Sequence, residues 1–398
     1  MDNHKPYQKQ DRRFWQIILA LTIASLLNFS TLYIFQPLLP VFVDTYNITA
    51  TVSSFLMSAS VVTMMVGLFV LGFSADRYGR KTIMILSLVM TVLTLILIPY
   101  TTSFTLIVIL RLIQGFFLAG IPAAAMGYLG NMIASQHLGM AMTFYIASNA
   151  LGGMGGRVWG GFSADQWGWQ SSLFSLGGFG VAVTIAFMVL LPTEPPTTTR
   201  RVSLTSDLKG MLIHLLDKRL MPLFLVGLLL QVLFTAVWTY LPFYLKGDPF
   251  NWSLKWISFT YLAYVLGVLA PPLASRFSNR YGLSRVMIAG LLFLGLGTWI
   301  TAIQSGFIIV FGLTLICTGF FISHSMAAAL VNQTATHHKS GASSFYLINY
   351  YLGVAIGSTA VGKLWDLFSW TGILSTSLLL IIVLLFSPFY KRMDDLAK

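Results

Sequence analysis

Two arginines lie inside long apolar runs of this sequence, where a charge requires a partner. Arg111 follows the run FTLIVIL, and Arg157 lies within the run GGMGGRVWGG. A cation in such surroundings costs on the order of several kcal/mol unless it is paired or faces water. Three roles remain open. The side chains extend to lipid headgroups, or they pair structurally with Asp44 or with backbone carbonyls. The third role is direct action, as a proton-linked switch or as a site for an anionic group of a substrate.

His324 lies in the apolar run 306–330 and is the only histidine so placed. Imidazole titrates close to neutral pH, so His324 is a candidate proton carrier. The alternative is a neutral histidine that is hydrogen-bonded where helices pack. His337 and His338 stand beside Lys339 without further ligands, so we predict no metal site.

The other polar residues inside apolar runs are amides and aromatics. Those that we take as candidate contacts for coupling or substrate are Tyr33, Gln36, Gln114, Asn149, Gln231, Trp238 and Asn349. An uncharged, aromatic cavity suits an amphipathic solute better than a sugar, which needs many directed hydrogen bonds. The sequence shows neither the reactive clusters of a membrane enzyme nor a nucleotide-binding motif. We therefore expect neither an enzyme nor an organic cofactor.

The elements that position these residues must lie in a bilayer. Of the 398 residues, 56% are hydrophobic and only 9% are charged, against about 25% charged residues in soluble proteins. So much apolar surface cannot be hidden in a soluble core. The net charge of +12 then indicates loops that face anionic lipid rather than nucleic acid. Cys317 is the only cysteine, which excludes a disulfide framework.

Twelve runs are long enough for the roughly 20 apolar residues that a spanning helix needs. They are 15–42, 53–74, 82–100, 105–128, 139–162, 171–192, 221–244, 255–275, 286–304, 306–330, 341–363 and 371–390. Gln36-Pro37 should break the first run near its outer end. The polar stretch 193–220, which includes a short helix, has six runs on each side. We therefore predict an all-α membrane protein with six-helix bundles at 1–192 and 221–398, joined by a cytoplasmic linker at 193–220.

The lysines and arginines orient this array. If the N-terminus is cytoplasmic, nineteen of the 24 Lys and Arg residues lie in cytoplasmic segments. The outer segments hold only Lys246, Lys255 and Lys363. The positive-inside rule therefore predicts that both termini are cytoplasmic.

One turn sequence occurs four times. Residues 72–81 read GFSADRYGRK and residues 161–170 read GFSADQWGWQ, and degraded copies occupy 275–285 and 362–370. The first and third copies are basic and suit the cytoplasmic side, whereas the others carry tryptophans that suit the outer interface. The second pair follows the first by about 200 residues. A three-span unit that is doubled twice is typical of one transporter architecture.

Three motifs make the sequence resemble the major facilitator superfamily over essentially its whole length. Gly72-x-x-x-Asp76-Arg77-x-Gly79-Arg80-Lys81 fits the family's loop signature, and Arg111-Leu-Ile-Gln114-Gly115 resembles the signature of proton-coupled members. Gly152-x-x-x-Gly156-Arg157-x-x-Gly160-Gly161 resembles the antiporter signature of drug-efflux members, with Arg157 where that signature has proline. The chain is thus similar to the twelve-span bacterial drug and sugar efflux branch, whose members are proton antiporters.

The loop signature is expected to act as a conformational latch. Its residues are Gly72, Asp76, Arg77, Gly79, Arg80 and Lys81. The two glycines should allow a tight turn. Asp76 should dock at the N-terminus of the helix that starts at Lys339 when the cavity opens outward, and the resemblance implies the same latch.

The glycines of the antiporter-like motif should let another helix approach closely. They are Gly152, Gly156, Gly160 and Gly161. The resemblance implies that the approaching helix is the run 255–275.

Together these features predict a secondary active transporter that works by alternating access. We expect proton-driven efflux of small amphipathic organic compounds across the bacterial cytoplasmic (inner) membrane. The alternative is transport of an organic anion that Arg111 and Arg157 bind. The expected partners are a small-molecule substrate and membrane lipids, with no nucleic acid, and the chain is expected to be monomeric.

Overall fold

The computed structural model describes residues 6–194, 217, 219–335, 339–386 and 390. Every regular element among them is a helix, which confirms the predicted all-α class. The helices satisfy their own backbone hydrogen bonds, as a bilayer requires. Most of the predicted linker lies outside the described residues, and so does the short helix that the sequence predicts there.

Ten of the described helices are long and apolar enough to cross a bilayer. Two further helices, α8 (Ser135–Trp167) and α16 (Lys339–Ala355), occupy the predicted runs 139–162 and 341–363. The first is rich in glycine and polar residues, and the second has 17 residues before a π-helical turn at Ile356–Ala360. The helices are therefore consistent with the predicted count of twelve spans.

The chain forms two compact units. The first unit contains Met1–Val41 and Ala59–Arg200, and the second contains Phe42–Ser58 and Arg201–Lys398. The segment 42–58 thus belongs with the second unit although it precedes most of the first in sequence. The sequence predicted one boundary, at the linker 193–220, whereas the structure also assigns segment 42–58 to the second unit.

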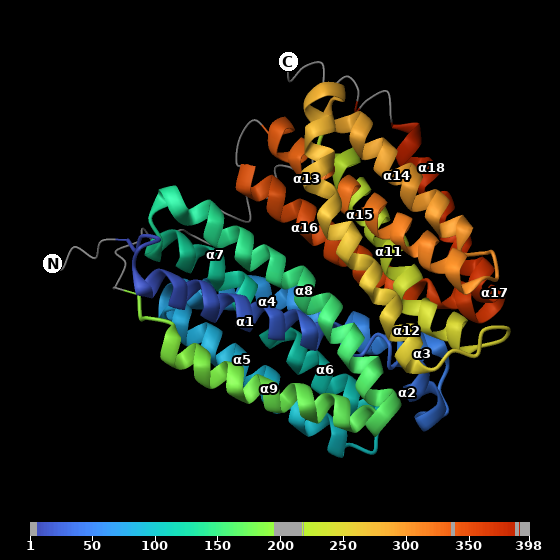
Figure 1. Ribbon diagram of the computed structural model, residues 1–398, viewed down its shortest axis with the longest axis horizontal. Helices are drawn as coiled ribbons and strands as arrows, with labels where there is room; N and C mark the ends of the chain where they lie inside the picture. Colours follow the sequence, from blue (N-terminus) through green and yellow to red (C-terminus); the bar gives the residue numbers. More distant parts are fainter. Residues whose placement is uncertain (1–5, 195–216, 218, 336–338, 387–389, 391–398) are drawn as a thin grey trace. The chain divides into compact units, whose positions relative to one another are not determined.

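The first unit is built around the seam between α1 and α8, which run side by side (Figure 1). The α1 helix ends at Tyr33, so the predicted break at Gln36-Pro37 is confirmed. The helices of this unit are α1 (Arg12–Tyr33), α4 (Phe55–Tyr78), which begins in the second unit, α5 (Arg80–Leu97), α6 (Phe104–Leu118), α7 (Gly120–Met132), α8 and α9 (Trp169–Leu190).

The second unit is built around α11 (Met221–Lys246), most of whose residues are buried. It packs against α15, α16, α17 and α18. The other helices of this unit are α2 (Leu39–Tyr46), which begins in the first unit, α3 (Ala50–Ser53), α12 (Leu254–Thr260), α13 (Tyr264–Tyr281), α14 (Leu283–Ile300), α15 (Gly306–Thr334), α17 (Gly362–Ser375) and α18 (Leu379–Leu385).

The segment 42–58 is fastened to the second unit by polar contacts. Asp44 forms an ion pair with Lys246 at the end of α11. Thr51 Oγ1 donates to Asp366 Oδ2 at 2.6 Å. These side chains come from α2, α3, α11 and α17, so α2 and α3 are held to one group of helices at several points.

The repeated turn sequence has a common backbone feature in all four copies. Gly79, Gly168 and Gly282 have φ angles of 94°, 84° and 92°. The fourth copy has Ser369 in the corresponding place, with φ 51° and ψ −136°, and α17 bends there. Glycine reaches this conformation without penalty, whereas a residue with a Cβ atom is strained in it. The positive φ common to the four copies supports the fourfold repeat that the sequence indicates.

Candidate functional site

The basic turn between α4 and α5 contains a chain of charged groups. Arg80 Nη2 donates to Asp76 Oδ1 at 2.7 Å, and Arg80 Nη1 donates to Glu194 Oε1 at 3.1 Å. Lys81 Nζ donates to the Met188 carbonyl at 3.2 Å. Two carboxylates therefore share one arginine, and the start of α5 is tied to the end of α9.

Only one of the two glycines in this motif makes the turn. Gly79 joins α4 to α5 with its positive φ. Gly72 lies inside α4, which continues to Tyr78, so its predicted role in the turn is wrong. A Cβ atom there would make only an ordinary contact with Ala123 Cβ at 3.7 Å. Arg77 is exposed and lies over the Tyr78 ring, 5.4 Å from its centre.

Arg111 satisfies main-chain carbonyls at the end of α1. Its side chain on α6 is fully buried. Nη1 donates to the Thr31 carbonyl at 3.3 Å and Nη2 to the Leu32 carbonyl at 3.1 Å. The last carbonyls of a helix lack intrahelical donors, and a cation also complements the helix dipole there. The guanidinium carbon lies 4.2 Å from the centre of the Phe35 ring.

Gln114 connects Arg111 to a third helix. Its Oε1 accepts a hydrogen bond from Arg111 Nη1, and its Nε2 donates to Thr94 Oγ1 on α5 at 2.8 Å. Arg111 and Gln114 are three residues apart, so they lie on one face of α6. The pair therefore links α1, α6 and α5 through buried polar groups.

Arg157 binds the same break in α1 from α8. Its Nε donates to Gln36 Oε1 at 2.5 Å and its Nη1 to the Gly153 carbonyl at 2.8 Å. The guanidinium carbon lies 3.8 Å from the centre of the Tyr33 ring, a cation–π contact. Both buried arginines therefore contact the short stretch that ends α1.

These contacts decide between the roles that the sequence left open. Extension to headgroups is wrong, because Arg111 is 0% exposed and Arg157 is 4% exposed. Among the described residues, Asp44 forms its ion pair with Lys246, so pairing of the arginines with Asp44 is not observed. Backbone carbonyls satisfy Arg111, which is the structural alternative. A direct role in coupling stays a prediction.

The glycine stripe of α8 packs against α1. The stripe residues are all buried: Gly152, Gly156, Gly160 and Gly161. A Cβ atom at Gly156 would lie 2.5 Å from the Ser30 Cα atom. One at Gly152 would lie 2.4 Å from the Leu26 carbonyl oxygen, and one at Gly160 would lie 2.7 Å from that of Ile34, the residue after α1. The helix on these three glycines is therefore α1, and the expected approach of the run 255–275 stays a prediction. Asn149 strengthens the same seam, because its Oδ1 accepts a hydrogen bond from Ser25.

In the second unit, rings gather beside α11. Phe234 stacks on Phe320 with 3.7 Å between ring centres. Trp238 lies 5.0 Å from Tyr261 and 4.9 Å from Tyr264, again between ring centres. These rings come from α11, α15, α13 and the short 3₁₀ helix before α13. They form the first part of what we call the aromatic cluster.

His324 extends this cluster toward α16. Its Nδ1 is 3.0 Å from Tyr346 Oη, within hydrogen-bond distance, and its ring centre is 4.8 Å from that of Tyr350. The aromatic cluster thus consists of Phe234, Trp238, Tyr261, Tyr264, Phe320, His324, Tyr346 and Tyr350. The sequence placed the histidine inside a span but could not identify its hydrogen-bond partner.

Two further predicted residues, Gln231 and Asn349, lie on the helices α11 and α16 that carry parts of the aromatic cluster. Gln231 Nε2 donates to Thr235 Oγ1 at 3.1 Å, and Asn349 Nδ2 donates to the Phe345 carbonyl at 2.9 Å. Within the part of the chain that the structure describes, Gln231 Oε1 and Trp238 Nε1 are buried without a hydrogen-bond partner. Buried polar atoms are usually paired, so these two are candidates for a ligand contact.

The described residues include no group of three or more His, Cys, Asp or Glu side chains placed to hold a metal ion. His337 and His338 lie outside the described residues, so the prediction made for them stays a prediction.

Two residues of these networks were not predicted. Glu194 was assigned to the linker, although its side chain is only 10% exposed and pairs with Arg80. Glu194 follows the apolar run of α9 by only a few residues, and this position could have indicated that its side chain lies near the basic turn. Thr94 gave no signal, because a threonine in an apolar run is usually a packing residue.

The comparisons with known proteins agree with this architecture. The family model described as Major Facilitator Superfamily matches residues 21–270 and 250–397. An inner membrane transport protein of Escherichia coli, YnfM, is 33% identical over 94% of this chain and 90% of that protein. The uncharacterized MFS-type transporter YybF of Bacillus subtilis is 30% identical over 95% of this chain and 93% of that protein.

A solved structure extends the likeness to the fold. It is an inward-facing bacterial homologue of the human lysosomal transporter Spinster, with a TM-score of 0.79 over 98% of this chain and 99% of that one. At 13% identity the match shows the fold alone. The helical architecture, the family match and the transporter relatives together show that this chain is a membrane transporter and belongs to the Major Facilitator Superfamily.

Proposed function

We propose that this transporter exports small amphipathic organic compounds in exchange for protons. In this proposal it works by alternating access, as a monomer, in the bacterial cytoplasmic membrane with both termini in the cytoplasm. The E. coli relative YnfM is an inner membrane transport protein, which supports this location, and the distribution of basic residues supports the orientation.

The observation that carries the proposal is a set of two buried polar atoms on α11, one of them in the aromatic cluster, that have no hydrogen-bond partner among the described residues. Gln231 Oε1 can accept one hydrogen bond and Trp238 Nε1 can donate one. Rings contact Trp238, and ring faces bind apolar bodies and organic cations. Gln231 lies about two helical turns before Trp238 on the same helix. A compound with a flat apolar body and one or two polar groups would satisfy both features.

An organic anion has weaker support as the substrate. The guanidinium groups of Arg111 and Arg157 already donate to oxygens of α1, α6 and α8 and to Gln36 Oε1 in the break after α1. An anion would have to displace several of these charge-assisted hydrogen bonds, which are stronger than neutral ones. The arginines are therefore assigned to positioning the end of α1.

The proposal places the coupling proton on His324. Neutral His324 can accept a hydrogen bond at Nδ1 from Tyr346, whereas a protonated imidazole can only donate. Protonation would thus reverse or break the 3.0 Å contact between these residues. Because both rings belong to the aromatic cluster, the change would alter the surface that we assign to the substrate.

The proposal can be tested with purified protein in liposomes that contain a trapped pH-sensitive dye. A lipophilic cation, a neutral amphipathic compound and an organic anion are added in turn across an imposed pH gradient. We expect the first two to move protons. We expect Trp238→Ala to abolish the response, whereas Trp256→Ala, at a position 59% exposed and outside the cluster, leaves it intact.

Two results would overturn the proposal. Proton movement with the anion alone, lost in both Arg111→Lys and Arg157→Lys, would identify an anion transporter. Uptake of the compounds that no pH gradient affects would show that protons do not drive the transport.

A further inference from the structure

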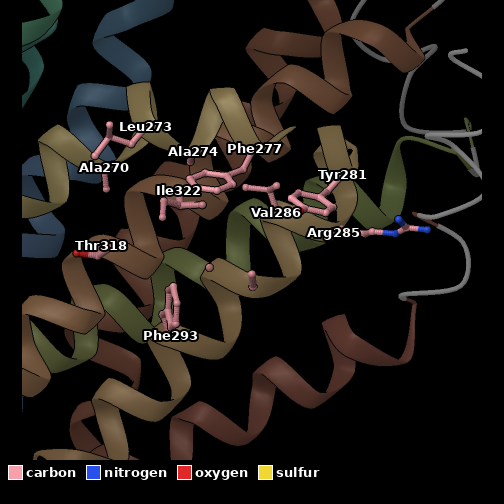
Figure 2. Close-up of a pocket in the computed structure, with 12 residues that line it drawn as sticks. Ala270, Leu273, Ala274, Phe277, Tyr281, Arg285, Val286, Phe293, Thr318 and Ile322 are labelled. Carbon is pink, nitrogen blue, oxygen red and sulfur yellow. The ribbon is translucent and has the colours of Figure 1, made fainter. Parts of the chain in front are cut away.

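A groove of about 460 Å³ opens on the second unit between α13 and α14, with α15 behind it. Figure 2 shows apolar side chains along it, including Phe277, Phe293 and Ile322. Tyr281 and Arg285 lie together at one end (Figure 2). The groove is therefore apolar along its length and has a cation at one end.

Residue size explains why a groove forms there. Ala270, Ala274 and Ala289 line it where larger residues would fill the space. Leu273 and Phe277 are 56% and 58% exposed, so large apolar side chains stand at its surface. In a membrane protein, such an outward apolar surface meets lipid chains rather than water.

The length of the groove matches one leaflet of a bilayer. Along α13 it extends from Ala270 to Tyr281, which is about 16 Å at 1.5 Å per residue. The hydrocarbon core of a bilayer is about 30 Å thick. The groove thus has the depth of a lipid chain that enters from one side of the membrane.

The charged end favours an anionic headgroup. Arg285 is exposed at the start of α14, and the Arg280 guanidinium carbon lies 5.3 Å from the centre of the Tyr281 ring. Within the described residues, neither arginine forms an ion pair with a carboxylate. Arginine binds phosphate oxygens strongly. In the proposed orientation, on which this inference rests, the basic end faces the cytoplasmic leaflet, which carries anionic lipid.

We propose that this groove is a binding site for one anionic glycerophospholipid of the cytoplasmic leaflet. One acyl chain lies in the groove and the phosphate contacts Arg285. Thr318 and Ile322 of α15 face the groove, whereas Phe320 and His324, two positions further on, project from the other side of that helix. The bound lipid therefore supports α15 from behind the aromatic cluster and is not the transported compound.

Native mass spectrometry of the purified protein tests this site, with phosphatidylglycerol and phosphatidylcholine added separately. We expect one phosphatidylglycerol to be retained more tightly than phosphatidylcholine. Arg285→Ala should weaken phosphatidylglycerol binding about fivefold, the effect of roughly one basic residue at an anionic surface, and leave phosphatidylcholine unchanged. Arg276→Ala is the matched control, because it removes an exposed arginine of α13 that does not line the groove.

Variants at two further positions, Ala289 and Leu266, test the groove itself. Ala289→Phe, and the smaller change Ala289→Leu, should reduce retention of both lipids because they fill the space. Leu266→Phe enlarges an exposed residue of α13 outside the groove and should have no effect. The proposal is overturned by equal retention of the two lipids, by undiminished binding in both Ala289 variants, or by equal losses in Arg285→Ala and Arg276→Ala. Displacement of the lipid by amphipathic compounds that leave Trp238 unperturbed would also overturn it, since the groove would then take those compounds.

Discussion

Arg111 Nη2 donates a hydrogen bond to the Leu32 carbonyl at 3.1 Å, so a cation on α6 completes the last turn of α1. The helix stops there because Pro37 cannot donate a backbone hydrogen bond. Arg111 belongs to the motif that resembles the signature of proton-coupled members. In this chain it stabilises the end of α1.

Replacing Arg111 with alanine is expected to destabilise the first unit. The carbonyls of Thr31 and Leu32 would lose their donor, and each unsatisfied buried group costs about 1–3 kcal/mol. Arg111→Lys should recover only part of the loss, because an ammonium group cannot reproduce the planar fork. Unfolding in detergent measures both variants. The exposed Arg77→Ala is the control, and wild-type stability of Arg111→Ala would contradict the positioning role.

Two neighbouring glycines of α8 should respond to alanine with opposite signs. A Cβ atom at Gly156 meets the backbone of Ser30, whereas nothing lies within 4 Å of one at Gly155. Gly156→Ala should cost about 1–3 kcal/mol through overpacking. Gly155→Ala should stabilise the helix by about 0.5–1 kcal/mol. Denaturant titrations in mixed micelles compare the two, and equal effects would show that α1 does not pack on the stripe.

A glycine in place of Ser369 should remove backbone strain from the fourth copy of the repeated turn. Ser369 has φ 51° where the other copies have glycine. We expect Ser369→Gly to raise the thermal unfolding temperature, because a conformation of this kind costs about 1–3 kcal/mol. The reciprocal change, Gly168→Ser, should lower it. An unchanged temperature in both variants would mean that a positive φ at these positions does not strain a residue with a Cβ atom.

The predicted latch gives a test of conformational preference. Replacing Asp76 with asparagine keeps the shape of the side chain and removes the charge that would favour a helix N-terminus. We expect Asp76→Asn to shift the protein toward the inward-open state. Single cysteines placed on each side, after Cys317→Ser removes the only native thiol, report accessibility. Labelling rates identical to those of the parent from both sides would refute the latch.

His324→Gln separates the binding of a compound from proton movement. Glutamine can still hydrogen-bond to Tyr346, but it cannot take up a proton near neutral pH. We expect the variant to bind an amphipathic compound, measured by tryptophan quenching, and to lose proton movement in the liposome assay. If proton movement persists, another group carries the proton.

The sequence could predict features that depend on local chemistry. Hydrophobic run length determines which segments become helices, and Pro37 and Gly79 fix a break and a turn through their own backbone constraints. Partners between distant segments could not be predicted, since polarity alone does not say which surface a side chain meets. Glu194 and Asp44 show this, because each pairs with a base far away in the sequence.

Because segment 42–58 belongs to the second unit, dividing the chain at the linker would separate residues that contact one another. A gene divided at the linker would encode two fragments, and the first would carry two helices that the second needs. The second fragment alone would lack Asp44 opposite Lys246 and Thr51 opposite Asp366. We therefore expect the second fragment to form its complete unit only in a cell that also synthesises the first.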